Sequence, residues 1–139
     1  MKKPVIVDIP EKMEKFFGIK GKMLHPDILM VENLVRLIPL GKITTVDALA
    51  KKMAKDFKAD ISCPLRTENA VKKIIEKCAD NASCDKLPFW RVVKKDKTII
   101  NSKNQELCSS KLKDDGFTLL YQKSGKIKVD FELSKLFSF

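Results

Sequence analysis

Four cysteines and a single histidine are the side chains of this 139-residue sequence that are typical of zinc sites, and the four thiols are also candidate nucleophiles. No two cysteines form a Cys-x-x-Cys pair, and His25 is distant from all four, which are Cys63, Cys78, Cys84 and Cys108. Because a zinc site needs ligands at tight local spacing, the pattern predicts no metal and no other cofactor. The N-terminus lacks the apolar stretch of a signal peptide. We therefore expect a cytoplasmic protein without a disulfide framework, in which the cysteines are small apolar residues.

The charge balance points to a polyanionic partner. The sequence has 28 lysines and arginines against 18 acidic residues, a net charge of +10 at pH 7. Such an excess favours either nucleic acid or an anionic membrane surface. No stretch is apolar for long enough to cross a membrane, and no membrane association is expected. A solvated, lysine-rich surface would give the same composition, so charge alone leaves nucleic-acid binding open.

The elements that must position these charges are mainly helical. Periodicity and capping signals predict helices over residues 8–17 (with Asp8 as N-cap and Gly18 as the stop), 26–38, 44–57, 64–78 and 105–115. Residues 117–122 and 126–131 flank Ser124-Gly125 as a hairpin, spanning 117–131. We therefore expect an α+β fold, a mainly helical winged helix-turn-helix with a small C-terminal β-hairpin wing. It should form a single domain over residues 1–139.

The helix over 64–78 is the best candidate for a recognition helix. Pro64 suits a first helical turn, where its missing N–H is not needed. The expected inner face carries Leu65, Val71, Ile74, Ile75 and Cys78. The expected outer face carries Arg66, Asn69, Lys72, Lys73 and Lys77. Thr44 or Thr45 can cap the preceding helix, and two helices in this order favour a helix-turn-helix, although a generic helical pair gives the same pattern.

Four short motifs in this order resemble the O6-alkylguanine-DNA alkyltransferases. That family's Pro-x-Gly-x-Val-Thr-Thr-Tyr motif is similar to Ile38-Pro39-Leu40-Gly41-Lys42-Ile43-Thr44-Thr45. Its active-site motif, Pro-Cys-His-Arg-Val-Val, is similar to Pro88-Phe89-Trp90-Arg91-Val92-Val93. Asn81 has the spacing of the family's hinge asparagine, and Leu112-Lys113-Asp114-Asp115-Gly116-Phe117 resembles its Leu-x-x-Glu-Gly-Val. The resemblance covers about residues 30–120. It leaves residues 1–29 as an N-terminal extension.

The departures from the family pattern predict a protein that is not an enzyme. The resemblance puts Phe89 where the family has its alkyl-accepting cysteine and Trp90 where it has the activating histidine. Because a thiolate is the nucleophile, neither replacement can accept an alkyl group. Asp115 keeps an acid at the glutamate position, but we expect nothing to remain for it to polarise. The non-enzymatic alkyltransferase-like proteins also replace the cysteine, commonly with tryptophan, but keep the histidine.

The side chains that flip a target base in that family are also replaced in this sequence. Val46 occupies the place of the family's tyrosine, and either Asn69 or Lys72 that of its intercalating arginine. Flipping costs a few kcal/mol of unstacking, so flipping by this chain is doubtful even where DNA binding is not.

The resemblance implies two sets of site residues. For DNA binding, with the recognition helix in the minor groove, they are Thr45, Arg66, Asn69, Lys72 and Lys73. For a base pocket they are Asn81, Pro88, Phe89, Trp90, Arg91 and Asp115. Phe89 and Trp90 either fill the old active-site channel as core or form an aromatic wall on which an alkylated base stacks. Arg91 is expected to be structural in both cases.

Three functions follow. The first is a monomeric protein that binds duplex DNA containing O6-alkylguanine and flags it for repair proteins. The second is a winged-helix DNA-binding module without lesion specificity, either a regulator or a nucleoid-associated protein. The third is an enzyme that uses a displaced acceptor such as Cys84 or Cys108, although no histidine lies near either in sequence.

Overall fold

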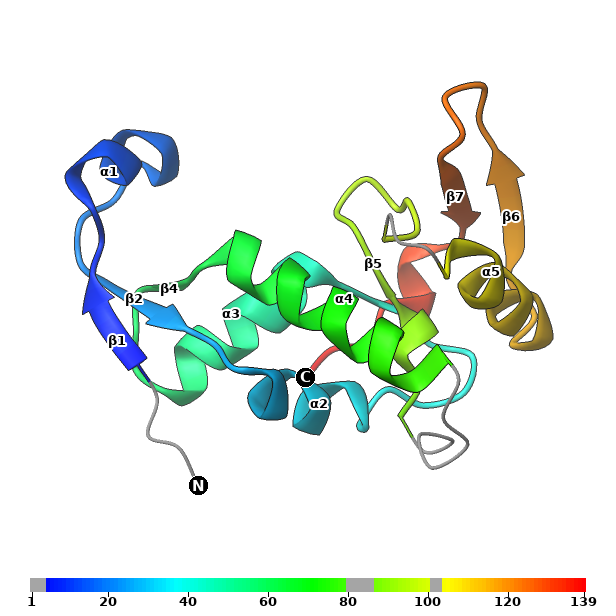
Figure 1. Cartoon of the computed structure of the whole chain (residues 1–139), viewed down its shortest axis with the longest axis horizontal. Helices are drawn as coiled ribbons and strands as arrows, with labels where there is room; N and C mark the ends of the chain where they lie inside the picture. The colour runs from blue at the N-terminus through cyan, green and yellow to red at the C-terminus, as the bar shows by residue number, and fades with distance from the viewer. Residues whose placement is uncertain (1–4, 80–86, 101–103) are drawn as a thin grey trace.

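The computed structural model describes residues 5–79, 87–100 and 104–139, which form a mixed α+β fold (Figure 1). In chain order the elements are β1 (Val5–Asp8), α1 (Glu11–Phe17), β2 (Lys22–His25), α2 (Ile28–Val35), β3 (Thr44–Thr45), α3 (Val46–Asp56), β4 (Ile61–Ser62), α4 (Pro64–Ala79), η2 (Phe89–Arg91), β5 (Val92–Val93), α5 (Gln105–Asp114), β6 (Thr118–Tyr121), β7 (Ile127–Asp130) and η3 (Leu133–Lys135). Among the described residues, no helix combines the length and apolarity needed to span a bilayer.

The N-terminal extension builds a small sheet. Strand β1 pairs antiparallel with β2, and β2 pairs parallel with β4, directly before α4. Asp8 belongs to β1 and its carboxylate pairs with Lys22 on β2, so the expectation that Asp8 caps the first helix is wrong. Helix α1 begins after Pro10 instead and ends, as expected, at Gly18, whose φ of 71° is a left-handed conformation that glycine adopts without strain.

Helices α2, α3 and α4 enclose the main core. Apolar residues at helical spacing point inward on each helix, including Val31 and Val35 on α2 and Leu49 and Met53 on α3. Asp27 caps α2 by accepting a hydrogen bond from Met30 N at 2.9 Å. Caps of this kind satisfy backbone N–H groups that have no partner inside the helix.

Helix α4 follows the expected inner face except at its first turn. Val71, Ile74, Ile75 and Cys78 are buried as predicted, but Leu65 is 66% exposed. Thr67 takes the inward position instead. Its hydroxyl donates to the Cys63 carbonyl at 2.9 Å, which satisfies the buried polar group. Cys78 is in a disulfide, so the expectation that no cysteine forms one is wrong, whereas Cys63 and Cys108 are buried free thiols.

Two short sheets complete the structure. Strand β3 pairs parallel with β5, with Thr44 opposite Val92 and Thr45 opposite Val93. This pairing joins two of the motifs that resemble the alkyltransferases. Strands β6 and β7 form the predicted C-terminal hairpin, with Thr118 opposite Asp130, and it projects from the body beside α5 (Figure 1).

Candidate nucleic-acid interface

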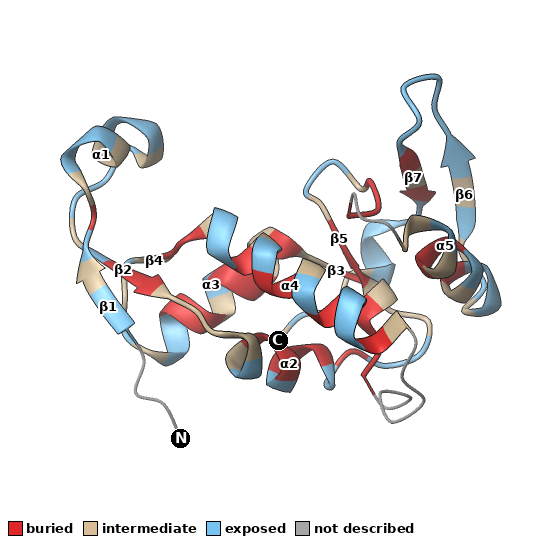
Figure 2. Ribbon diagram, viewed as in Figure 1, coloured by how far each residue is buried: buried red, intermediate tan, exposed pale blue. Residues whose placement is uncertain are grey.

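Helix α4 has exposed residues along its length (Figure 2), and all of them except Leu65 are polar. Arg66, Asn69 and Lys73 are exposed, and Lys72 is half-buried at the flank. The opposite face of the helix packs on the core. The sequence therefore predicted correctly which side of α4 is available to a partner.

Ion pairs make this side less basic than the sequence suggests. Lys72 Nζ lies 3.8 Å from the Glu68 carboxylate, which is also 3.5 Å from Lys94 Nζ. Lys77 Nζ donates to Glu32 Oε1 at 3.0 Å. A cation that is already paired gains less from a phosphate, because the existing pair must first be broken.

Arg66 and Lys73 are the cations of α4 without an ion pair among the described residues. Burial lowers the pKa of His25, and the positive charge of Arg66 lowers it further. Arg66 therefore contributes positive potential at the first half of α4, where an anion would approach.

Thr45 has a structural role in addition to the proposed contact. Its hydroxyl oxygen caps α3 by accepting a hydrogen bond from Ala48 N at 3.1 Å. The hydroxyl proton remains available to donate, so capping and a phosphate contact are compatible. Thr45 is half-buried at the start of α3.

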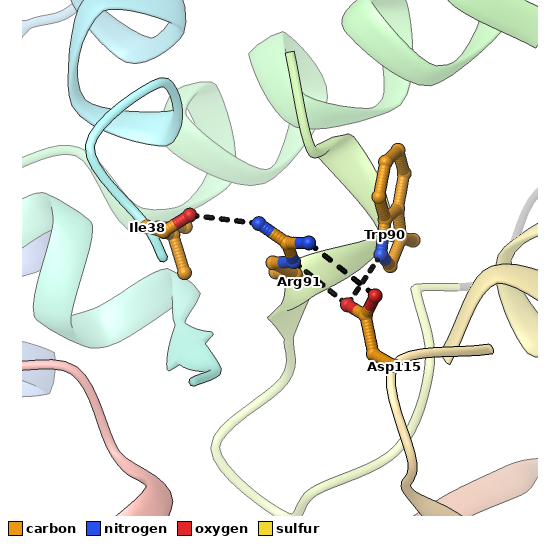
Figure 3. Close-up of polar contacts among 4 residues, drawn as sticks. All are labelled: Ile38, Trp90, Arg91 and Asp115. Atoms are coloured by element: carbon orange, nitrogen blue, oxygen red, sulfur yellow. Dashed lines mark hydrogen bonds and ion pairs between the residues drawn. The ribbon is translucent and has the colours of Figure 1, made fainter. Parts of the chain in front are cut away.

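Arg91 joins three motifs that are far apart in the sequence (Figure 3). Its Nε donates to Asp115 Oδ2 at 2.7 Å, and its terminal nitrogens donate to Asp115 Oδ1 at 3.3 Å and to the Ile38 carbonyl at 2.9 Å. The side chains of Arg91 and Asp115 are only 12% and 7% exposed. The start of the 38–45 motif, the 88–93 motif and the end of α5 are therefore held together by one ion pair and its hydrogen bonds.

Trp90 also binds this acid. Its Nε1–H donates to Asp115 Oδ2 at 2.8 Å. We expected nothing to remain for Asp115 to polarise; the structure shows that it still accepts a hydrogen bond, although an indole is not a base. The indole bonds directly to the acid from the position that the resemblance assigns to a histidine. Arg91 Cζ and Lys111 Nζ each lie 5.2 Å from the centre of the Trp90 ring, within the range of cation–π contacts.

Phe89 lies inside the main core. It is 3% exposed and contacts Trp90 edge to face, with 5.2 Å between the ring centres. Pro88, which precedes it, is buried as well. In this conformation Phe89 offers no free face for a base to stack on. Asn81, the remaining residue of the predicted base pocket, lies outside the described residues.

The comparisons with known proteins address the fold. No protein-family profile matches the chain, and no curated protein sequence matches it. A crystal structure of S. pombe Atl1 in complex with damaged DNA containing O6-carboxymethylguanine has a similar fold, with a TM-score of 0.60 and 16% identity, over 80% of this chain and 94% of that one. The chain has the fold of the alkyltransferase-like proteins. A second structure, S. pombe ATL in complex with DNA, agrees with a TM-score of 0.57 and 17% identity over the same shares of both chains.

Within this alkyltransferase-like fold, Cys108 is poorly suited to accept an alkyl group. It is buried in α5, and burial raises the pKa of its thiol to about 12. Because the thiolate is the nucleophile, a thiol that stays protonated at neutral pH is unreactive. Cys84, the other displaced candidate, lies outside the described residues.

A groove beside α4 was missed by the sequence reasoning. It has a volume of about 1030 Å³ and lies between the start of α2, the end of α3 and the first half of α4. Arg66, Asn69 and Lys73 line one side of it, and none of the base-pocket residues that the structure describes does. No local signal could have indicated it, because its walls come from three separate helices.

Proposed function

We propose that this chain is a non-catalytic DNA-binding protein that recognises O6-alkylguanine in duplex DNA and flags it for repair proteins. The observation that carries the proposal is the alkyltransferase-like fold, shared with a structure bound to DNA containing O6-carboxymethylguanine. Phe89 and Trp90 support the absence of catalysis, because neither can act as nucleophile or base. We further propose a cytoplasmic, single-domain monomer in which the β6–β7 hairpin serves as the wing.

The proposed DNA contacts lie on α4 and at the start of α3. Arg66, Asn69 and Lys73 contact the duplex directly, with α4 in the minor groove, and Thr45 donates to a phosphate. Lys72 contributes less, because Glu68 already pairs with it. This assignment is supported by the exposure of α4 and by the charges of Arg66 and Lys73, which have no ion pair within the part of the chain that the structure describes.

Charge reversal on α4 tests the DNA interface. We expect Arg66→Glu with Lys73→Glu to weaken binding to every duplex sequence alike and to reduce the slope of log affinity against log salt by about 2. Two phosphate contacts are lost, and each contact releases about 0.9 counterion when it forms. Fluorescence anisotropy with labelled duplex over a series of salt concentrations measures both quantities.

A matched control separates this interface from the overall charge. Lys12→Glu with Lys15→Glu makes the same change in net charge on α1, which lies at one end of the molecule (Figure 1). Both lysines are exposed. We expect this pair to leave the salt slope nearly unchanged. Equal losses from the two double variants would contradict an interface on α4.

Intact-mass measurement tests the absence of alkyl transfer. After incubation with duplex DNA containing O6-methylguanine, we expect the protein to keep its original mass, because no activated thiolate replaces the missing acceptor. An active alkyltransferase in parallel verifies that the substrate is competent. A stoichiometric gain of one methyl group, mapped to any cysteine, would overturn the proposal that the protein is not an enzyme.

A second candidate function is a winged-helix module that binds DNA without lesion specificity, as a regulator or a nucleoid-associated protein. The burial of Phe89 favours it, since no aromatic wall is open to a flipped base at that position. The two functions differ in whether a lesion strengthens binding.

A further inference from the structure

The groove beside α4 has an apolar floor. Met53 and Leu34 are buried beneath it, and Phe57, half-buried at the end of α3, packs against the same core. A flat apolar group entering the groove could lie against Phe57, which is only half-buried, and lose contact with water. A small number of polar side chains above an apolar floor is typical of small-molecule sites, and the volume of about 1030 Å³ is at the upper end of their usual range.

The rim of the groove carries a net positive charge. Of its two acids, Asp56 pairs with Lys52 at 2.9 Å, whereas Asp27 caps α2 by accepting from Met30 N at 2.9 Å and keeps its negative charge. Arg66 and Lys73 line the groove and have no ion pair among the described residues. The rim therefore favours an anionic group, and a guanidinium is suited to binding phosphate.

Two amides complete the lining. Asn33 on α2 and Asn69 on α4 both face the groove and are exposed. An amide offers both a donor and an acceptor, which is the pairing that the edge of a nucleobase requires. The groove thus combines an apolar floor, amides and unpaired cations within one site. It shares no residue with the Trp90–Arg91–Asp115 network.

We propose that this groove binds a nucleoside phosphate, with the base against Phe57 and the phosphate at Arg66 and Lys73. The nucleotide is either an extrahelical residue of DNA lying along α4, which rests on the proposed function, or a free mononucleotide. In the first case the groove replaces the base channel that Phe89 fills. The mouth of the groove adjoins the exposed side of α4, so a nucleotide that leaves the duplex beside this helix has a short path to it.

Blocking the groove from α2 tests this without changing the proposed DNA contacts. Asn33→Trp places a large ring in the groove and leaves α4 intact. Leu37→Trp is the control, because Leu37 is 57% exposed just beyond α2 and does not line the groove. Thermal denaturation verifies that both variants fold. The probes are dGMP, a plain duplex and the same duplex with a single-nucleotide bulge, and affinities are measured by calorimetry and fluorescence anisotropy.

We expect the wild type and Leu37→Trp to bind dGMP with a Kd of about 1 mM or tighter, and Asn33→Trp to bind it at least about tenfold more weakly. A preference for the bulged duplex that Asn33→Trp abolishes, with plain-duplex affinity unchanged, identifies DNA as the source of the nucleotide. If Asn33→Trp loses dGMP binding and the wild type shows no preference for the bulged duplex, the ligand of the groove is a free nucleotide. Either result supports the site.

The site is overturned if the wild type neither binds dGMP in this range nor prefers the bulge, or if Asn33→Trp changes neither property. Salt-dependent binding of the plain duplex would then leave the proposed function standing. If no duplex is bound at all, the proposed function fails, and dGMP binding alone decides on the groove.

Discussion

Asp115→Ala is expected to lower the free energy of unfolding by about 3–5 kcal/mol, because it leaves the mostly buried guanidinium of Arg91 without its counter-charge. The same change removes the acceptor of the Trp90 indole N–H. Asp115 holds the end of α5 to the 88–93 motif, and through Arg91 to the Ile38 carbonyl. Urea denaturation followed by circular dichroism measures the loss.

Asp114→Ala is the matched control. Asp114 is the neighbouring acid at the end of α5, exposed and without an ion pair among the described residues. We expect it to change stability by less than about 0.5 kcal/mol. A double-mutant cycle of Asp115→Ala and Arg91→Ala should give a coupling energy of about 0.5–3 kcal/mol. Asp115→Ala leaves the buried charge of Arg91 unpaired, and Arg91→Ala removes that charge. Additive losses would contradict the role given to this pair.

Phe89→Ala is expected to cost about 3–5 kcal/mol of stability, since it removes a large buried ring and leaves a cavity beside Trp90. Affinity for plain and O6-methylguanine duplexes should then fall equally, and only in proportion to the unfolded fraction. Thermal denaturation measured beside both affinities distinguishes packing from recognition.

Phe16→Ala on α1 controls for the loss of a phenyl ring, because Phe16 is 81% exposed. It should change stability by less than about 0.5 kcal/mol. If Phe89 instead stacks on a flipped base, its removal would cost about 1–3 kcal/mol on lesion DNA beyond the loss on plain duplex. That result would show that the base binds at Phe89, in the position of the family's active-site channel.

Local patterns predicted the helical part of the fold well. Apolar spacing located α2, α3 and α4, and the small polar residues before α3 indicated a cap that the structure assigns to Thr45. The Ser124-Gly125 turn indicated the hairpin correctly. The N-terminal sheet was missed because its three strands are short and β4, which pairs with β2, comes much later in the chain, after α2 and α3. Short strands that pair across a long stretch of chain show little alternation of apolar and polar residues in the local sequence.

The site was less predictable, because its energetics depend on pairs that meet only in three dimensions. Glu68 and Lys72 have the i,i+4 spacing of a helical ion pair, but only the structure shows that Lys94 of another segment shares the same carboxylate. Asp115 looked idle because the histidine was missing, yet Trp90 supplies an N–H in its place. Residue patterns predicted the main helices and the C-terminal hairpin. Which charges remain unpaired follows only from packing.

The affinity of the wild-type protein for an O6-methylguanine duplex and for the identical undamaged duplex, measured side by side at one low salt concentration, tests the central claim most directly. A lesion-recognising protein should bind both through α4. It should bind the damaged duplex more tightly by about 1–3 kcal/mol, the value of one stacked base. Equal affinities would contradict lesion recognition and leave a DNA-binding module without lesion specificity, and no binding to either duplex would contradict the DNA-binding role itself.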